Sequence, residues 1–311
     1  MKIAYIILAH KNFDQLNRLI DRLSDEDVRF FIHISKTSKW QFYEQSYRAL
    51  KSKSNCQFVK REKVYWGDFS LVQAILNGIK AVCSHDTNFD FTVILSGQDY
   101  PLKSSQKIKS EFEKYRGKQL LEYFTLPYDG WGKKGGMERF QKYHFWFKNN
   151  NYRFPPTSSK GVFFDFLIQI ISIFLGEERS LPYNLKPYGG ATWSVFSLEC
   201  IEYISNFVDS KEGKRLKRYF RYTWGSCEMF FQTVIMNSQI AETVIWHYLS
   251  YCEFPEEKGG HTRIFTSEDS ERLLSTKCLF ARKFDMDVDS EILDIIDRSI
   301  EKSVSSSTSG R

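Results

Sequence analysis

The chain has 311 residues, of which 42% are hydrophobic and 16% aromatic, so it can bury a large core and is not intrinsically disordered. Its formal net charge of +6 favours anionic partners such as nucleotide phosphates, polyanionic glycans or an acidic membrane surface. Six cysteines without C-x-x-C spacing indicate neither a zinc site nor a disulfide framework, and we expect a reducing, cytoplasmic environment.

The first hundred residues alternate between strand and helix patterns. Residues 3–9 form a continuous apolar run, which predicts a buried strand, and a helix with Leu16, Leu19, Ile20 and Leu23 on one face follows. Further strands are expected at 28–34, 57–59 and 91–95, with a helix at 71–82. This alternation predicts an α/β fold with a Rossmann-like, mostly parallel central sheet and helices on both of its faces.

The second half of the chain has a less regular pattern. Residues 130–187 are rich in aromatic residues, Lys, Asn and Pro, which predicts long ordered loops that form a substrate surface. Helices are expected at 197–208, 227–236, 267–274 and 291–300. The Ser-rich residues 303–311 predict a disordered tail. We expect one domain over 1–302, with a nucleotide-binding half (1–125) and an acceptor and catalytic half (126–302).

Two segments raise the question of membrane contact. Residues 162–175 are apolar but too short to span a bilayer, so they form either an interfacial helix or a segment packed on the core. Residues 214–222 are basic and aromatic, which fits lipid phosphates, nucleic acid or an anionic glycan, or else a solvated helix face. No nucleic-acid-binding motif accompanies this run, so we expect no nucleic-acid partner.

Ligands of parallel α/β sheets bind outside the carboxyl ends of the strands. Three polar segments occupy such positions in the predicted sheet: His10 and Lys11, the turn from His33 to Lys36, and residues 96–101, which include Asp99. No G-x-G-x-x-G follows the first strand, which disfavours a dinucleotide-dependent oxidoreductase.

Glu228 is the candidate catalytic base. It lies in the sequence Trp-Gly-Ser-Cys-Glu-Met-Phe-Phe, at the predicted start of a helix whose dipole favours an ionised carboxylate. A carboxylate can take a proton from an attacking hydroxyl. An acidic residue in a first helical turn can equally be a simple charge stabiliser of that helix.

Cations near the C-terminus are candidates for contact with a diphosphate. Arg263, Arg282 and Lys283 could neutralise the charge that develops on such a leaving group, or could be ordinary surface cations. The sequence Asp-Met-Asp-Val-Asp at 285–289 resembles a metal-binding D-x-D, but capping of the following helix by Asp289 or Ser290 explains it better. We therefore expect no metal site.

Two glycines precede Trp193. Gly189 and Gly190 would let the backbone approach a ligand closely, and the Trp193 ring could stack on a sugar. A tight turn followed by a core Trp accounts for the pattern equally well.

Seven segments in order resemble the core-2/I-branching β-1,6-N-acetylglucosaminyltransferase family, which includes the peptide O-xylosyltransferases. They are residues 4–10, 31–36, 64–72, 95–101, 189–196, 228–234 and 279–285, and the last, Leu-Phe-Ala-Arg-Lys-Phe-Asp, is the most distinctive. The resemblance implies a GT-A type fold and an inverting displacement that needs no divalent metal or other cofactor beyond the UDP-sugar donor.

The resemblance also implies roles for particular residues. Glu228 matches the catalytic base, and Lys283 matches a lysine that contacts the UDP diphosphate, with Arg263 as its partner or Arg282 as the substitute. The remaining implied positions are as follows: His10, His33, Ser35, Tyr65 and Trp66 border the nucleotide, Glu122 and Arg139 bind the acceptor, and Asp99 lies between donor and acceptor.

Two positions depart from the family pattern on the donor side. Ser35 stands where the family often has Asp, and Thr192 stands where xylosyltransferase-like members can carry Asp before the Trp. N-acetylglucosamine is therefore only the family default for the donor sugar, and xylose or another hexose stays open.

The chain begins directly at the first strand, and animal members of the family carry a Golgi anchor and disulfides. This contrast predicts a bacterial, cytoplasmic relative that extends or branches a surface polysaccharide on a glycan or lipid-linked oligosaccharide acceptor, with possible peripheral contact at the inner membrane face. The competing interpretation is a catalytically inactive glycan- or nucleotide-binding module.

Overall fold

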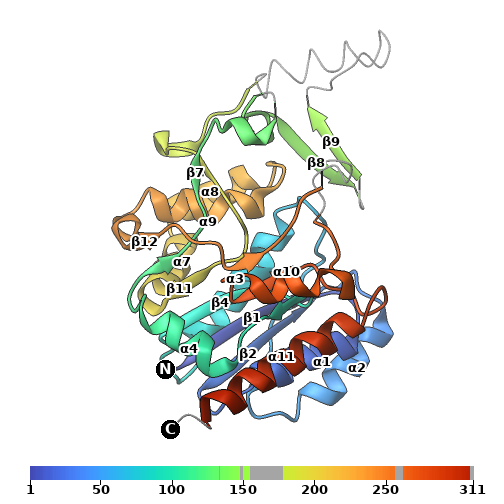
Figure 1. Ribbon diagram of the computed structural model, residues 1–311. Coiled ribbons are helices and arrows are strands. Elements are labelled where there is room, and N and C mark those ends of the chain that lie inside the picture. The colour runs from blue at the N-terminus through green and yellow to red at the C-terminus, as the bar shows by residue number, and fades with distance from the viewer. Residues whose placement is uncertain (133, 148–149, 155–177, 256–261, 309–311) are drawn as a thin grey trace.

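The computed structural model describes residues 1–132, 134–147, 150–154, 178–255 and 262–308 (Figure 1). The strands are β1 (Ile3–Ala9), β2 (Val28–Ile34), β3 (Cys56–Phe58), β4 (Phe91–Ser96), β5 (Asp99–Pro101), β6 (Gln119–Leu120), β7 (Phe124–Thr125), β8 (Tyr143–Phe147), β9 (Asn150–Phe154), β10 (Tyr188–Gly189), β11 (Val195–Ser197), β12 (Val244–Ile245), β13 (Ser250–Tyr251) and β14 (Phe280–Arg282).

The α-helices are α1 (Phe13–Leu23), α2 (Trp40–Leu50), α3 (Ser70–Cys83), α4 (Ser105–Glu113), α5 (Glu138–Gln141), α7 (Leu198–Asp209), α8 (Lys211–Phe220), α9 (Phe230–Met236), α10 (Ser270–Ser275) and α11 (Glu291–Thr308). Short 3₁₀ turns are η1 (Asp129–Trp131), η2 (Pro182–Asn184), η3 (Ser226–Glu228), η4 (Gln239–Thr243) and η6 (Ser267–Asp269).

The central sheet has the strand order β12-β6-β11-β4-β1-β2-β3. β1 pairs in parallel with β2 and β4, β2 with β3, and β12 with β6, whereas β11 runs antiparallel to both of its neighbours. A three-stranded sheet, β13-β14-β5, and the two-stranded pairs β7-β10 and β8-β9 accompany it. The predicted α/β fold with a mostly parallel central sheet is confirmed.

Side chains of β1 point alternately to two cores, one on each face of the sheet. Ile3, Tyr5 and Ile7 lie in one core, which is covered by α1, α2, α4 and α11. Ala4 and Ile6 lie in the other, which is covered by α3, α7, α8 and α9. Because β1 is buried on both faces it reads as a continuous apolar run, as parallel strands do.

In three stretches the local structure differs in part from what the sequence predicts. The predicted helix at 227–236 is instead the 3₁₀ turn η3 followed, after Met229, by α9. The predicted loop region 130–187 contains the hairpin β8–β9, because Tyr143 to Phe147 is an aromatic run that suits a strand. The predicted tail is helical up to Thr308. There, hydroxyls of Ser303 and Ser305 donate to carbonyls one turn earlier.

Across the described ranges, no helix has the length and apolar character needed to cross a membrane. The apolar segment 162–175 lies outside the described residues. All six cysteines are free thiols. The division of the domain at residue 125 stays a prediction, and strands from both sides of it build the central sheet.

Candidate active site

The strand order places the candidate site beside the end of β1. The chain proceeds from β1 to β2 and β3 on one side and then returns to β4 on the other side of β1. Such a reversal leaves a crevice at the carboxyl ends of the two strands, where ligands of α/β sheets bind. His10 follows β1 there, and Gly97, whose N–H donates to the Leu8 carbonyl, follows β4.

A buried glutamine joins the C-terminal segment to these strand ends. The Gln15 side-chain amide, on α1, donates to the carbonyls of Gly97 (3.0 Å) and Phe284 (3.1 Å) and accepts from the Met286 N–H (2.9 Å). Gln98 donates to the Phe284 carbonyl at 3.1 Å. These bonds hold Lys283 beside His10. The sequence analysis missed Gln15, although a Gln on the apolar side of a predicted helix needs polar partners.

Cations gather at this crevice. The pKa of Lys283 is lowered, first by burial and then by the charges of Arg282 and Lys11. The pKa of His10 is lowered by burial and by both Lys283 and Lys11. The nearby anion is Asp285, which forms an ion pair with Lys11. Positive charge is therefore in excess here, which suits an anionic ligand.

Arg282 lies between the basic group, which is made of His10, Lys11 and Lys283, and the residues around Glu228. It pairs in register with Asp99 across β14 and β5, and its Nε lies 3.6 Å from an Asp99 carboxylate oxygen. Its guanidinium lies 4.3 Å from the centre of the Trp193 ring. Asp99 is fully buried and accepts from the Ser96 backbone N–H (2.8 Å) and the Ser250 hydroxyl (3.1 Å). Trp193 and Asp99 thus fix the position of Arg282.

Glu228 and Arg139 form an ion pair of 2.8 Å. The Arg139 guanidinium lies 3.8 Å from the centre of the Trp131 ring and 4.5 Å from that of Trp224. Two aromatic rings and one carboxylate therefore fix a single orientation of the arginine, and through it the Glu228 carboxylate.

The pKa of Glu228 is raised above its usual value. Burial is the largest cause, and it outweighs the opposing effects of Arg139 and Arg282. Burial thus opposes the ionisation that the predicted helix start would favour. Glu228 ends the 3₁₀ turn η3, one residue before α9 begins, and 42% of its side-chain surface remains accessible.

A second carboxylate lies close to Glu228. The pKa of Glu122 is raised by burial and by the negative charge of Glu228, against a hydrogen bond from the Ala191 N–H. Gly190 connects the two residues, because its N–H donates to the Glu228 carbonyl (2.9 Å) while its Cα packs against the Glu122 carbonyl. The structure thus brings Glu122 and Arg139 to Glu228, and the charge of Arg282, which lies against Trp193 and Asp99, also reaches Glu228.

His33 and Ser35 bind neighbouring backbone groups. The His33 ring accepts from the Glu62 N–H at 2.8 Å, and burial lowers its pKa to about 4, so it is neutral. The Ser35 hydroxyl accepts from the Val64 N–H at 3.1 Å. Both residues therefore hold the segment that carries Tyr65 and Trp66. Trp66 is 65% exposed, and its ring meets that of Trp224 edge-on at 5.6 Å.

Arg263 has acidic partners. Its guanidinium donates to Asp269 at 2.8 Å and lies 3.5 Å from Glu253, while its backbone carbonyl accepts from the Lys283 N–H. It is therefore neutralised within the protein, whereas Arg282 lies next to the basic crevice. Arg282 also has an acidic partner, Asp99, but it is the arginine that lies beside Lys283 and the basic crevice.

The Asp-rich segment caps α11. Asp289 accepts from the N–H groups of Ile292 (3.0 Å) and Ser267 (2.8 Å), as the capping interpretation predicts. Among the described residues, no cluster of His, Cys, Asp and Glu has the geometry of a metal site.

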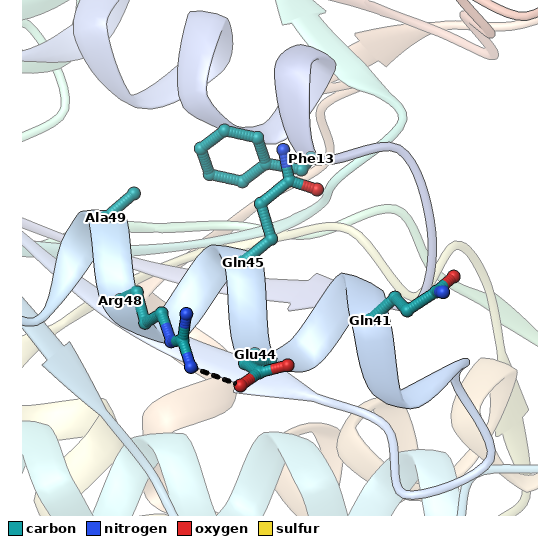
Figure 2. Close-up of a pocket in the computed structure, with 6 residues that line it drawn as sticks. All are labelled: Phe13, Gln41, Glu44, Gln45, Arg48 and Ala49. Carbon is teal, nitrogen blue, oxygen red and sulfur yellow. Dashed lines mark hydrogen bonds and ion pairs between the residues drawn. The ribbon is translucent and has the colours of Figure 1, made fainter.

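A surface hollow of about 550 Å³ lies between α1 and α2, away from these residues (Figure 2). Phe13 and Gln45 face each other across it, and the Glu44–Arg48 ion pair (2.6 Å) runs along α2. It contains none of the predicted site residues and no cluster of titratable groups suited to chemistry.

Comparison with known proteins identifies the family. The family model described as Core-2/I-Branching enzyme matches residues 3–275. The chain belongs to this family. The predicted membership is confirmed, and with it membership in a family of glycosyltransferases. The matched range contains Glu228, Arg139 and Glu122 but ends before Arg282 and Lys283.

Curated relatives of this Core-2/I-Branching chain are xylosyltransferases. Xylosyltransferase 2 of Rattus norvegicus is 25% identical over 318 residues, which cover 96% of this chain and 33% of the relative. The xylosyltransferase of Ciona intestinalis is 24% identical (96% and 34%), and xylosyltransferase 1 of Homo sapiens is 23% identical (96% and 30%). The chain thus spans about a third of the length of these relatives.

Solved structures show weaker likeness. The galactosyltransferase LgtC, in complex with donor and acceptor sugar analogs, matches with a TM-score of 0.43 and 9% identity over 90% of this chain and 86% of its own. Mouse xyloside xylosyltransferase 1 matches with a TM-score of 0.38 and 10% identity, over 90% and 97%. Both scores are too low to support an inference.

Proposed function

We propose that the protein is an inverting glycosyltransferase that moves a sugar from a UDP-sugar donor to a glycan acceptor, with Glu228 as the catalytic base. One observation carries this proposal. The Glu228 carboxylate, fixed by Arg139, lies within electrostatic reach of Arg282, whose neighbour Lys283 belongs to the basic group at the ends of β1 and β4. A candidate base and a crevice rich in cations therefore adjoin each other.

The chemistry follows from this arrangement. Glu228 accepts the proton of the acceptor hydroxyl as the hydroxyl oxygen attacks the anomeric carbon of the donor sugar. The bond from that carbon to the diphosphate oxygen breaks on the opposite side, and UDP leaves with the electron pair, so the anomeric configuration inverts. A carboxyl whose pKa is raised towards the working pH is suited to general-base catalysis. Glu122, beside it, would accept hydrogen bonds from other acceptor hydroxyls.

Fixed cations would take the place of a divalent metal at the diphosphate. Lys283 and Arg282 are partly buried beside His10 and Lys11, and their charges are poorly balanced by Asp285. Charge that develops on the leaving diphosphate would relieve this imbalance, and such stabilisation contributes most where it is strongest in the transition state. We include Lys11 in this group, which the sequence analysis did not.

We propose the donor sugar, the acceptor and the cellular location only as classes. N-acetylglucosamine is the family default, and the relatives named xylosyltransferases make UDP-xylose the second donor to test. The acceptor would be a glycan or a lipid-linked oligosaccharide used in bacterial surface polysaccharide synthesis in the cytoplasm. Residues His33 and Ser35 would act by positioning the Tyr65–Trp66 segment beside the nucleotide.

Donor hydrolysis tests the proposal without knowledge of the acceptor. The purified protein is incubated in EDTA with a panel of UDP-sugars, and released UDP is measured for the wild type, Glu228→Gln and Lys283→Ala. Glu199→Gln is the matched control for Glu228, because Glu199 is an exposed acid in the first turn of α7. Lys118→Ala removes an exposed cation elsewhere and is the control for Lys283.

We expect hydrolysis of one donor that EDTA does not diminish, a fall of about 10² to 10⁴ in rate for Glu228→Gln, and wild-type rates in both controls. Restoration of activity by Mg²⁺ or Mn²⁺ after EDTA treatment would contradict the metal-independent mechanism. If no UDP-sugar is hydrolysed or bound in calorimetry, the inactive binding module is the correct interpretation.

A further inference from the structure

Helix α8 presents a row of cations to solvent. Leu216, Tyr219 and Phe220 bury one side of the helix in the core. The exposed residues on its other sides are one acid, Glu212, and the cations Lys211, Lys214, Arg215 and Arg218, followed by Arg221 directly after the helix. The buried side fixes the helix, so the cations are held in place rather than carried on a flexible segment.

These cations lack acidic partners. Among the described residues, none of Lys211, Lys214, Arg215, Arg218 and Arg221 forms an ion pair. By contrast, the cations of α1 are paired, as Arg18 is with Asp294 and Asp297. Repulsion within the α8 group is therefore not relieved by direct ion pairs, although Glu212 and Asp209 lie at the start of the helix.

The electrostatic environment of Lys217 shows how dense this charge is. Its pKa is lowered by burial and by the positive charges of Arg221, Lys214 and Lys80, against the single acid Asp209. Lys80 belongs to α3 and is exposed, so the positive surface extends beyond α8.

Exposed aromatic side chains adjoin the end of this helix. Tyr222 is 39% exposed, and its ring lies 5.4 Å from that of Phe145, which is 40% exposed. Phe145 pairs across the hairpin with Tyr152, which is 49% exposed. The Tyr222 carbonyl accepts from the His144 N–H, so the hairpin is joined to the end of α8. Both elements lie at the same end of the molecule (Figure 1).

We propose that this basic-aromatic surface, made of the exposed cations of α8 with Lys80 and Arg221 and the rings of Phe145, Tyr152 and Tyr222, binds the surface of an anionic phospholipid bilayer. Clustered Lys and Arg attract anionic head groups, and exposed aromatic rings insert at the boundary between head groups and acyl chains. The adjoining rings favour a bilayer over duplex DNA, which would be held by the charges alone.

The surface is continuous with the candidate active site. The Trp146 indole N–H, on β8, donates to the Trp66 carbonyl at 3.4 Å. The Trp66 ring contacts the ring of Trp224, and the Arg139 guanidinium packs on that second ring. Arg139 in turn holds Glu228. A bilayer bound at the hairpin would therefore lie next to the acceptor side of the site. The corollary that the acceptor is carried by a lipid rests on the proposed function, whereas bilayer binding does not.

Vesicle flotation tests the inference. The full chain is mixed with phosphatidylcholine vesicles or with vesicles containing about one third phosphatidylglycerol, near physiological salt. The variants are Lys214→Gln/Arg218→Gln for charge and Phe145→Ser/Tyr152→Ser for the rings. The control Lys118→Gln/Lys277→Gln removes two exposed cations elsewhere. Thermal unfolding confirms that each variant is folded, and donor hydrolysis is measured in parallel.

We expect binding to the anionic vesicles only. The affinity should fall by about fivefold for each cation removed from α8, or about 25-fold for the double variant, and should be unchanged in the control. The aromatic variant should bind more weakly and become more sensitive to salt. Donor hydrolysis should be equal in all variants, so a protein that hydrolyses no donor would fail the proposed function and not this inference.

Three results would overturn it. The first is an absence of binding to anionic vesicles, and the second is equal binding by the α8 double variant and the wild type. The third is tighter binding to heparin or to duplex DNA through the same residues, with no effect of the aromatic substitutions, which would assign a soluble polyanion instead.

Discussion

Gly190 offers a direct test of the site because the surrounding backbone leaves no space for a methyl group. A Cβ atom would lie 1.9 Å from the Glu122 carbonyl oxygen, 2.7 Å from its carbonyl carbon and 3.1 Å from the Tyr123 Cα. All three are backbone atoms, so no flexible side chain can move aside. The Gly190 N–H also donates to the Glu228 carbonyl at 2.9 Å, so any shift of residue 190 separates Glu122 from Glu228.

The size of the effect follows from these distances. Carbon and carbonyl oxygen atoms come no closer than about 3.3 Å, so Gly190→Ala requires a displacement of roughly 1.4 Å. Overpacking of this kind typically destabilises a protein by about 1–3 kcal/mol. A misplacement of about 1 Å in a catalytic site can reduce the rate about 100-fold. We therefore expect the variant to fold with reduced stability and to lose most of its activity.

Urea unfolding and UDP release in the presence of donor check both parts. Gly117→Ala is the control, because Gly117 has φ +76° with no atom within 4 Å of its Cβ position. It should lose about 1 kcal/mol through backbone strain and keep full activity. If Gly190→Ala were as stable and as active as the wild type, the close contact that places Glu122 beside Glu228 would be refuted.

Three further predictions concern buried polar groups. Burial lowers the pKa of His33 from 6.5 to about 4, so between these two pH values only the unfolded chain binds a proton at this ring. The free energy of unfolding should therefore fall by up to about 3 kcal/mol as the pH is lowered from 6.5 to 4. His33→Gln, which keeps an acceptor, should show a shallower fall in urea unfolding curves, and an unchanged slope would contradict the assignment. Gln15→Leu leaves the Phe284 carbonyl and two other buried groups without this hydrogen-bond partner. We therefore expect the free energy of unfolding to fall by about 2–4 kcal/mol and UDP to bind more weakly in calorimetry. An unaltered UDP affinity would rule out a positioning role for Gln15. The base acts when ionised, so activity should disappear as the pH falls through the raised pKa of Glu228. Because Arg139 lowers this pKa, Arg139→Gln should move the acidic limb of the pH–rate profile to higher pH. Movement to lower pH would show that Arg139 does not stabilise the carboxylate.

The sequence predicts the sheet well because burial on both faces makes β1, β2 and β4 plainly apolar. It fails for α2 (Trp40–Leu50), where the exposed Trp40 and Tyr47 contact the partly buried Tyr43 and hide the helical period. Propensity alone gives no account of such surface stacking.

The candidate site is predictable only in part, since motif order identifies residues but not their partners. The ion pairs of Arg139 with Glu228 and of Arg282 with Asp99 join segments whose proximity depends on the tertiary fold. The raised pKa of Glu228 likewise depends on how much protein surrounds it, which a helix-start pattern does not reveal.

Helix α11 packs against the first helix of the chain. Arg18 and Arg22 of α1 pair with Asp297, and Ile292 and Ile296 complete the core that β1 begins. During synthesis, the apolar side chains of β1 that face this core emerge long before the helix that covers them. The nascent chain therefore carries an incomplete core until α11 has left the ribosome, and this exposed apolar surface is one that chaperones can shield.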